Sequence, residues 1–100
     1  MRGFWVKVTR HGKHLMVAAC DEDMIGMRIE DGDFCVKVQE GFYMGEKLGS
    51  QEAIEIIRRG TIINLIGNEI VDLAVSHKLV HPDAVIRIGK IAHAQIVHIL

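Results

Sequence analysis

Residues 61–69 read Thr-Ile-Ile-Asn-Leu-Ile-Gly-Asn-Glu. The Ile-rich run over 61–66 is short and bounded by glycine on both sides, which favours a strand over a helix. Asn68 is expected to cap a helix over 69–78. A strand that enters a helix through a glycine turn often binds anions, because free backbone N–H groups and the positive end of the helix point outward there. This turn is therefore the first candidate for a binding site.

The N-terminal half shows the two-residue period of half-buried strands. Apolar residues alternate on either side of a turn at 10–13, which predicts a β-hairpin over 4–19, and the pattern returns at 34–38 as a third strand. Asp21 is expected to cap a single helical turn that ends at Gly26. The glycine-rich segment 40–49 is interpreted as a flexible loop.

The C-terminal half alternates helical and strand patterns. A helix over 51–59 is expected to start at a Ser50 cap and end at Gly60, and two last strands are expected at 85–88 and 95–99 with a loop between them. The predicted fold is α+β. It has an N-terminal three-stranded antiparallel part (hairpin plus strand), then helix-strand-helix and two C-terminal strands in a mixed sheet with helices packed on it. Residues 1–100 are expected to form a single domain.

Composition limits the classes of partner. A net charge of −1 and a pI of about 6.6 argue against a sequence-specific DNA-binding protein, which normally has a basic face. The chain is 49% apolar with a mean hydropathy of +0.20, so a homo-oligomer with an apolar interface is expected. We find neither a signal-peptide pattern nor an apolar run of roughly 18 residues, so a cytoplasmic protein without membrane association is expected.

Histidine and cysteine give little sign of metal or nucleophilic chemistry. The spaced pairs His11/His14 and His77/His81 lack a carboxylate or cysteine at a recognised ligand spacing, so no metal site is expected. The two cysteines, at positions 20 and 35, are interpreted as small buried hydrophobes. The carboxylate that follows the first would raise its thiol pKa rather than lower it. No cofactor is expected, and a binding protein is favoured over an enzyme.

A polar set in the C-terminal half is the remaining candidate for a ligand site. Asn64 interrupts an apolar strand, so its amide either bonds neighbouring backbone or points into a pocket, because a buried unpaired amide costs on the order of 1–3 kcal/mol. Arg87, Lys90 and His93 form either an anion clamp or an ordinary charged surface. The candidate ligand-binding residues are Asn64, Gly67, Asn68, Arg87, Gly89, Lys90, His93 and Gln95.

Short strings in order along the chain carry a family resemblance. They are Ala19-Cys20-Asp21, Gly32-Asp33, Phe42-Tyr43-x-Gly45, Asn64-x-x-Gly67, Ile86-Arg87-Ile88-Gly89 and His93-Ala94-Gln95. Together they resemble the archaeal domain-of-unknown-function 424 family over essentially the whole chain. The resemblance implies an uncharacterised, stand-alone archaeal protein with an α+β fold and a loose association with translation. Lys90 and Ala92 depart from the family pattern, where a glycine and a proline are expected.

The leading functional hypothesis is a non-enzymatic binding module linked to RNA or translation. Base stacking is assigned to Tyr43 or Trp5, provided that either is exposed. The first alternative is a small-anion or nucleotide-binding protein or enzyme that uses the 64–69 turn, with His93 as acid or base. The second alternative is a structural subunit of a larger complex.

Overall fold

The predicted strand-to-helix turn is present in the computed structural model, which describes residues 3–99. Strand β6 (Ile62–Ile66) leads through Gly67 into helix α3 (Asn68–Ser76). The strand prediction for 61–66 is therefore confirmed. Gly67 has a φ of 126°, a conformation that side-chain-bearing residues rarely adopt.

A six-stranded mixed sheet in the order β5-β1-β2-β6-β8-β7 forms the centre of the molecule. Besides β6, its strands are β1 (Phe4–His11), β2 (His14–Asp21), β5 (Glu46–Leu48), β7 (Ile86–Ile88) and β8 (Ile91–Val97). β2 and β6 run parallel, and the other neighbours are antiparallel. Strands β3 (Arg28–Asp31) and β4 (Phe34–Lys37) make a separate two-stranded ribbon. The α+β class and the mixed sheet are as predicted.

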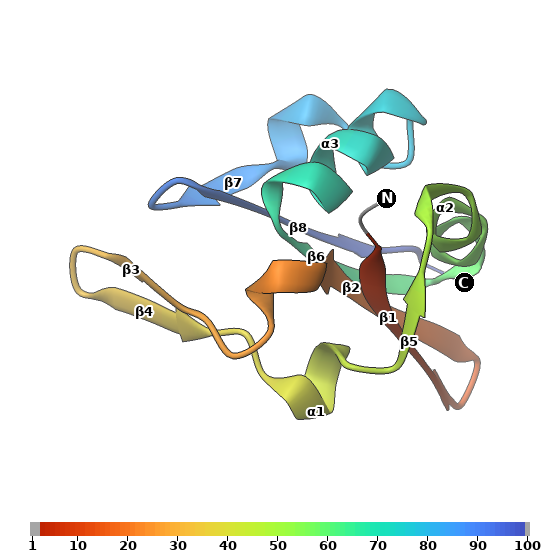
Figure 1. The fold of residues 1–100 in the computed structure, drawn as a ribbon. Coiled ribbons are helices and arrows are strands. Elements are labelled where there is room, and N and C mark those ends of the chain that lie inside the picture. Colours follow the sequence, from red (N-terminus) through yellow and green to blue (C-terminus); the bar gives the residue numbers. More distant parts are fainter. Residues whose placement is uncertain (1–2, 100) are drawn as a thin grey trace.

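The two faces of the sheet are covered differently. Helix α2 (Ser50–Arg59) and α3 pack on one face, whereas helix α1 (Glu40–Tyr43), the short 3-10 helix η1 (Glu22–Met24) and the β3–β4 ribbon lie on the opposite face (Figure 1). Inward-facing residues of α2 and α3 and alternate residues of the strands form the larger core. A smaller core lies beneath the other face. A second 3-10 helix, η2 (Pro82–Ala84), connects α3 to β7.

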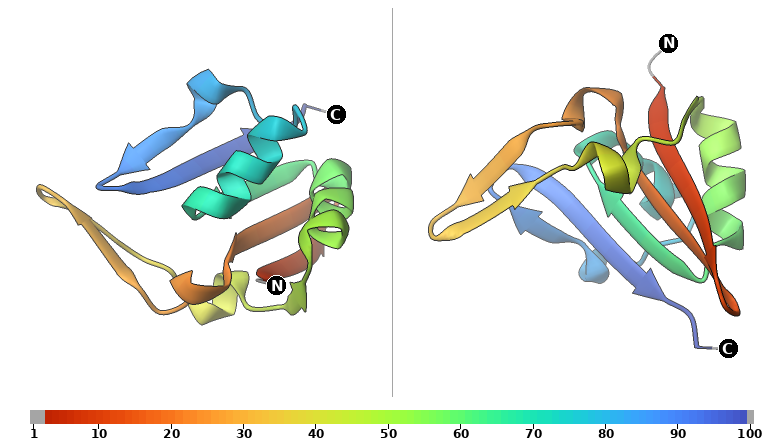
Figure 2. Two further views of the ribbon diagram at one scale, coloured as in Figure 1. Left: turned by 45° about the horizontal axis from the view of Figure 1, so that its top comes forward. Right: turned by 90° about the horizontal axis from the view of Figure 1, so that it is seen from below.

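The ribbon and the β7–β8 hairpin both project from the same side of the molecule, as the two views of Figure 2 show. Their tips are joined where the N–H of Gly89 donates to the carboxylate of Asp31, at 3.1 Å. The smaller core continues between them through residues such as Ile29 and Ile88, which are both buried. The ribbon is therefore anchored to the β7–β8 hairpin through Ile29 and the contact at its tip, although most of its residues are exposed.

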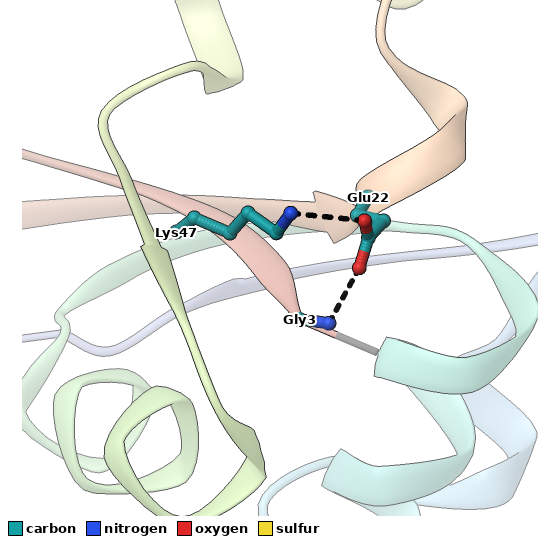
Figure 3. A network of polar contacts seen from close by, with 3 residues as sticks. All are labelled: Gly3, Glu22 and Lys47. Carbon is teal, nitrogen blue, oxygen red and sulfur yellow. Dashed lines mark hydrogen bonds and ion pairs between the residues drawn. The ribbon is translucent and has the colours of Figure 1, made fainter. Parts of the chain in front are cut away.

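A polar contact fixes the opposite edge of the sheet. The carboxylate of Glu22, just after β2, accepts a 2.6 Å hydrogen bond from the N–H of Gly3 and pairs with the ammonium of Lys47 at 3.0 Å (Figure 3). These three residues lie at the start of β1, after the end of β2 and in β5. One side chain thus joins three segments at this edge.

Several details of the predicted fold are wrong. The strand at 34–38 forms β4, but it pairs with β3, which had no separate prediction, and the third antiparallel strand beside the hairpin is β5. The supposed loop 40–49 contains α1 and β5, and Tyr43 within it is buried. The glycine content predicted a flexible loop there, but the burial of Tyr43 against the smaller core fixes the segment.

The predicted helix caps and the last loop also differ. Neither Asp21 nor Ser50 caps the helix that follows it; Gly49 occupies the N-cap position of α2. The last two strands are joined by a tight turn at Gly89 and Lys90, so that β8 starts at Ile91 rather than at 95. His93 consequently lies within a strand.

The solvent exposure of individual side chains contradicts one prediction and leaves another untested. Cys20 is buried as expected, but Cys35 is exposed. Large apolar side chains are exposed at Ile86 and Val97, which leaves the homo-oligomer a prediction. The helices within residues 3–99 are too short to cross a lipid bilayer.

Candidate functional site

The N-terminus of α3 is already occupied by a carboxylate of the protein itself. The two oxygens of Asp21 accept hydrogen bonds from the backbone N–H groups of Glu69, at 3.0 Å, and Ile70, at 2.8 Å. Asp21 is only 5% exposed, and this burial raises the pKa of its carboxyl, although the two backbone hydrogen bonds act in the opposite direction. These two N–H groups are therefore not free to hold an external anion.

Gly67 makes room for that carboxylate. A Cβ atom at this position would lie 2.5 Å from the Asp21 carboxyl carbon, which is far inside van der Waals contact. The glycine is thus needed for its backbone conformation and for the close approach of Asp21. Its place in the strand-to-helix turn has a structural explanation that requires no ligand.

Asn68 anchors the β7–β8 turn instead of capping α3. Its Oδ1 atom accepts from the N–H of Ala92 at 2.8 Å and from the guanidinium of Arg87 at 3.1 Å, while its Nδ2 atom donates to the carbonyl of Lys90 at 3.0 Å. The structure therefore brings Asn68, Arg87 and Lys90 together. Their contacts mainly hold the hairpin against the start of α3.

The predicted clamp of Arg87, Lys90 and His93 does not assemble around one point. In the register of β7 and β8, Arg87 lies opposite Ala92 whereas Ile86 lies opposite His93. Because successive side chains of a strand point to opposite faces, Arg87 and His93 are on different faces of the sheet. Sequence reasoning placed His93 in a loop and so missed this alternation.

Asn64 and His93 meet on the face that carries α1. The Oδ1 atom of Asn64 lies 3.0 Å from the Nε2 atom of His93 and 3.4 Å from the hydroxyl of Tyr43. Asn64 is half-buried, and its Nδ2 atom has no hydrogen-bond partner among residues 3–99. Gln95 lies beside Asn64 in the register of β8 and faces the same way. The amide of Asn64 is thus held by side chains, and its Nδ2 atom remains available.

The tautomer of His93 follows from its surroundings. The Nδ1 atom is buried and has no hydrogen-bond partner in the described part of the chain. A buried N–H donor without a partner is rarer in proteins than an unpaired acceptor, so the proton belongs on Nε2, where it is donated to Asn64. Burial lowers the pKa of His93 below its ordinary value of 6.5, which keeps the ring neutral at pH 7.

A groove lies beside Asn64, between the sheet and α1. It has a volume of about 180 Å³ and is lined by Lys7, Thr9, Met16, Val17, Ala18, Gly41, Phe42, Ile62 and Asn64. The view from beneath the sheet shows α1 lying over β1 and β2, with the far end of their hairpin extending beyond it (Figure 2, right). The lining is mainly apolar, with an ammonium and an amide at its sides.

Phe42 is the exposed aromatic residue of this groove. The residue is 41% exposed, and its ring meets the ring of Tyr43 edge to face, with 4.8 Å between centroids and 74° between planes. Tyr43 itself is 7% exposed, and Trp5 is half-buried against the smaller core. Of the two aromatic residues that we expected to stack on bases, Tyr43 is therefore enclosed and Trp5 is only partly exposed. Sequence reasoning missed Phe42 and Lys7, although the adjacent aromatics of 42 and 43 were a usable signal.

Groups that could carry out nucleophilic or metal chemistry are not assembled here. Burial is the main cause that raises the pKa of the Cys20 thiol to about 12, and the charge of Asp21 adds to it. A thiol in that state is protonated at neutral pH and does not act as a nucleophile. Within residues 3–99, three or more potential metal ligands are nowhere grouped together.

Comparisons with known proteins agree with the fold and leave the chemistry open. None of the curated proteins compared matches this chain. The chain is similar to the crystal structure of an uncharacterized conserved protein from Methanopyrus kandleri, with a TM-score of 0.82 and 23% identity over 98% of this chain and 95% of that one. The family model described as "Protein of unknown function (DUF424)" matches residues 8–99. Because that match spans nearly the whole chain, the protein belongs to the DUF424 family.

Proposed function

We propose that this protein is a non-enzymatic module that binds single-stranded RNA in the groove between the sheet and α1. The observation that carries the proposal is that the exposed residue Phe42 and the half-buried residue Asn64 line the same groove. Proteins recognise unpaired RNA by stacking bases on aromatic rings and by hydrogen bonds to the base edges. An aromatic ring and a hydrogen-bonding amide in one small groove are the two parts that such recognition needs.

The ring of Phe42 is well placed for stacking. Its edge-to-face contact with the buried Tyr43 restricts its orientation while part of its surface remains open to solvent. A ring that is fixed before binding loses little conformational entropy when a ligand binds to it. Stacking of one base on an aromatic side chain is worth about 1–3 kcal/mol.

The size of the groove favours one base over a larger ligand. The volume of about 180 Å³ is below the range of about 300–1,000 Å³ that is usual for sites of drug-sized molecules and cofactors. A single base fits that volume, and the sugar and phosphates of its strand would lie outside it. The groove is less suited to a whole dinucleotide cofactor.

Basic side chains next to the groove supply contacts for the phosphates. Lys7 lines the groove, and Lys13 lies in the exposed turn of the β1–β2 hairpin. The net charge of the chain is −1, so this attraction is local and few phosphates are contacted. RNA binding should therefore be modest in affinity and should weaken with salt. Single-stranded RNA of the translation apparatus is the natural class to test first, in line with the family resemblance.

The RNA-binding proposal can be tested by fluorescence anisotropy with a labelled single strand of roughly 10 nucleotides, a length within the usual site size. We expect binding at about 50 mM salt that declines with a logarithmic slope of about −1.4, as expected for two neutralised phosphates. Binding that is undetectable at the lowest salt, or that does not change with salt, would contradict the proposal.

Matched variants locate the binding surface. Phe42→Leu keeps an apolar side chain but removes the stacking ring, so it should weaken binding by about tenfold. Phe34→Leu is the control, because Phe34 is 60% exposed but lies on the β3–β4 ribbon. Lys13→Ala should reduce the salt slope, whereas Arg58→Ala, which removes the same charge from the exposed end of α2, should not. Equal losses in each pair would place the binding surface elsewhere.

A further inference from the structure

We infer that two copies of this chain join through the open edge of β1, over residues 7–11, and form one continuous sheet. This interface goes beyond the proposed RNA binding and does not depend on it. Strand β5 is the outer neighbour of β1, but it pairs only with residues 4–6. The last four residues of β1 are exposed. Residues 7–11 therefore have no strand on their outer side within the described part of the chain.

The backbone groups that point out of this edge belong to Val8 and Arg10. Leu15 lies opposite Arg10 in the β1–β2 hairpin. The N–H of Leu15 donates to the hydroxyl of Thr61, and its carbonyl accepts from the N–H of Thr61, both on the far side of β2. In an antiparallel ladder the two residues of such a pair direct their backbone groups away from each other. The N–H and carbonyl of Arg10 therefore face the open edge, and those of Val8, two residues earlier, do the same.

A two-fold axis at Thr9 gives the register that matches these groups. It places Val8 of each copy opposite Arg10 of the other, and each such pair can exchange two backbone hydrogen bonds. Thr9 then lies opposite the same residue of the second copy, and threonine pairs are favourable across strands. An axis at Arg10 would place two like charges opposite each other. An axis at Val8 would bring Arg10 of the second copy opposite Val6, where β5 already lies.

The same register brings Arg10 of one copy next to Glu46 of the other. Glu46 pairs with Val6 on the outer side of β1. Arg10 of the second copy would lie opposite Val8, two positions farther along the same edge. Positions two apart on one edge point to the same face and are about 7 Å apart, which long side chains of opposite charge can span. The two-fold axis forms this ion pair twice.

A depression in the surface lies where the arginine of the second copy would enter. Its volume is about 320 Å³, and it is lined by Val6, Val8, Leu48, Ile56 and Glu46, with Lys7 and Gly45 at its border. Lys7 belongs to the opposite face, where its Nζ atom donates to the carbonyl of Gly41. Apolar side chains beside one carboxylate suit an arginine, whose stem is apolar and whose head is cationic. A second copy supplies such a side chain in register, and this complementarity identifies it as the occupant.

The opposite edge of the sheet lacks such a match. Strand β7 has only three residues, Ile86–Ile88. Ala92, which lies opposite Arg87, directs its N–H and carbonyl towards the start of α3, so the backbone groups of Arg87 face outward. A two-fold axis there would place Arg87 opposite itself, and like charges in that position are destabilising. The edge of β1 is therefore the better surface for a second copy.

Charge reversal tests the pairing of Arg10 with Glu46. In sedimentation velocity the wild type should form a dimer at about 200 µM, a concentration suited to a small interface. Arg10→Glu and Glu46→Arg should each raise the dissociation constant of the dimer about tenfold, because the two-fold axis repeats the repulsion at two places. An equimolar mixture of the two variants should dimerise like the wild type, since both ion pairs then have opposite charges again.

Three results of this experiment would overturn the inference. They are a wild type that remains monomeric at that concentration, a dimer that neither variant weakens, and a mixture that does not recover. Both substituted residues are exposed, so the variants should remain folded, and circular dichroism checks this before sedimentation.

Cross-linking tests the register. Thr9→Cys is made together with Cys35→Ser, because Cys35 is exposed whereas Cys20 is buried. Oxidation with diamide should then join two copies, since Cα atoms in a non-hydrogen-bonded antiparallel pair are about 4.5 Å apart, within the range of disulfides. His11→Cys in the same background is the matched control on the same strand and face, because the axis at Thr9 separates its two copies by about 13 Å. Equal cross-linking of the two variants on a non-reducing gel, or none in Thr9→Cys, would overturn the inference.

Discussion

The carboxylate of Asp21 accepts a 2.8 Å hydrogen bond from the backbone N–H of Ile70, which follows it by 49 residues in the chain. The contact exists because β2 and β6 are parallel neighbours, with Cys20 opposite Ile66. Asp21, which ends β2, and Gly67, which follows β6, therefore lie at the same end of the sheet. Asp21 thus satisfies the start of α3, a role that a residue of the turn itself usually has.

Replacing Asp21 should destabilise the fold. In Asp21→Ala the N–H groups of Glu69 and Ile70 lose their acceptor, and the second of these hydrogen bonds is buried. We expect the free energy of unfolding to fall by about 2 kcal/mol, as for the loss of a helix cap with a buried donor left unpaired. Urea denaturation measures the change. Asp72→Ala, an exposed change on the same helix, should stay within about 0.5 kcal/mol of the wild type.

Replacing Gly67 by alanine should be more costly than an ordinary glycine substitution at positive φ. Gly12 has a φ of 61° and open space around it, so Gly12→Ala measures the backbone cost alone, about 1 kcal/mol. Gly67→Ala adds a collision with the Asp21 carboxyl group to a φ of 126°. We expect a loss of about 3 kcal/mol in thermal or urea unfolding. A loss equal to that of Gly12→Ala would show that the carboxylate simply moves aside.

The local fold could be predicted where one chain segment determines its own structure. The run at 61–66, the helix over 50–59 and the first hairpin each follow from their hydrophobic periodicity, since each buries one face against a layer of the protein. The turn at Gly67 was recognised for the same reason. The local hydrophobic pattern was therefore sufficient to predict the class of fold and the position of the candidate turn.

What could not be predicted depends on contacts between distant segments. The role of Asp21 arises from the parallel pairing of β2 with β6, which no local pattern encodes. The separation of Arg87 from His93 follows from where the last hairpin turns, and a shift of that turn by one residue reverses the faces. The importance of Phe42 depends on the fold of α1 within a segment that its glycines marked as a loop.

The contacts of Asn68 predict an energetic coupling with Arg87. Their side chains are joined at 3.1 Å, but Arg87 is exposed, so its own loss should cost at most about 0.5 kcal/mol. Asn68→Ala also removes the hydrogen bonds to Lys90 and Ala92 and should cost about 1.5 kcal/mol. The double mutant should lose less free energy of unfolding than the sum of the two single-mutant losses, because each single mutation already removes the contact between Asn68 and Arg87. Strict additivity would mean that the guanidinium contributes nothing at this site.

The buried ring of His93 predicts a specific dependence of stability on pH. Burial lowers the pKa of His93 in the folded state below its ordinary value of 6.5. At pH values between the folded-state pKa of His93 and 6.5, the unfolded chain binds more protons than the folded one, so the free energy of unfolding rises with pH. The stability that the neutral ring of His93 contributes is fully present above about pH 6.5 and is lost as the pH falls towards the folded-state pKa.

His93→Gln isolates this contribution, because glutamine can still donate to Asn64 but does not titrate. Urea denaturation of both proteins across about pH 5 to 8, the range in which histidine changes charge, gives the difference in their free energies of unfolding. We expect the variant to gain relative to the wild type as the pH falls, since only the wild type must then lose a proton from position 93 to fold. The other histidines are common to both proteins and cancel in the difference. A difference that is constant over this range would mean that the ring of His93 is as easily protonated in the folded state as in the unfolded chain.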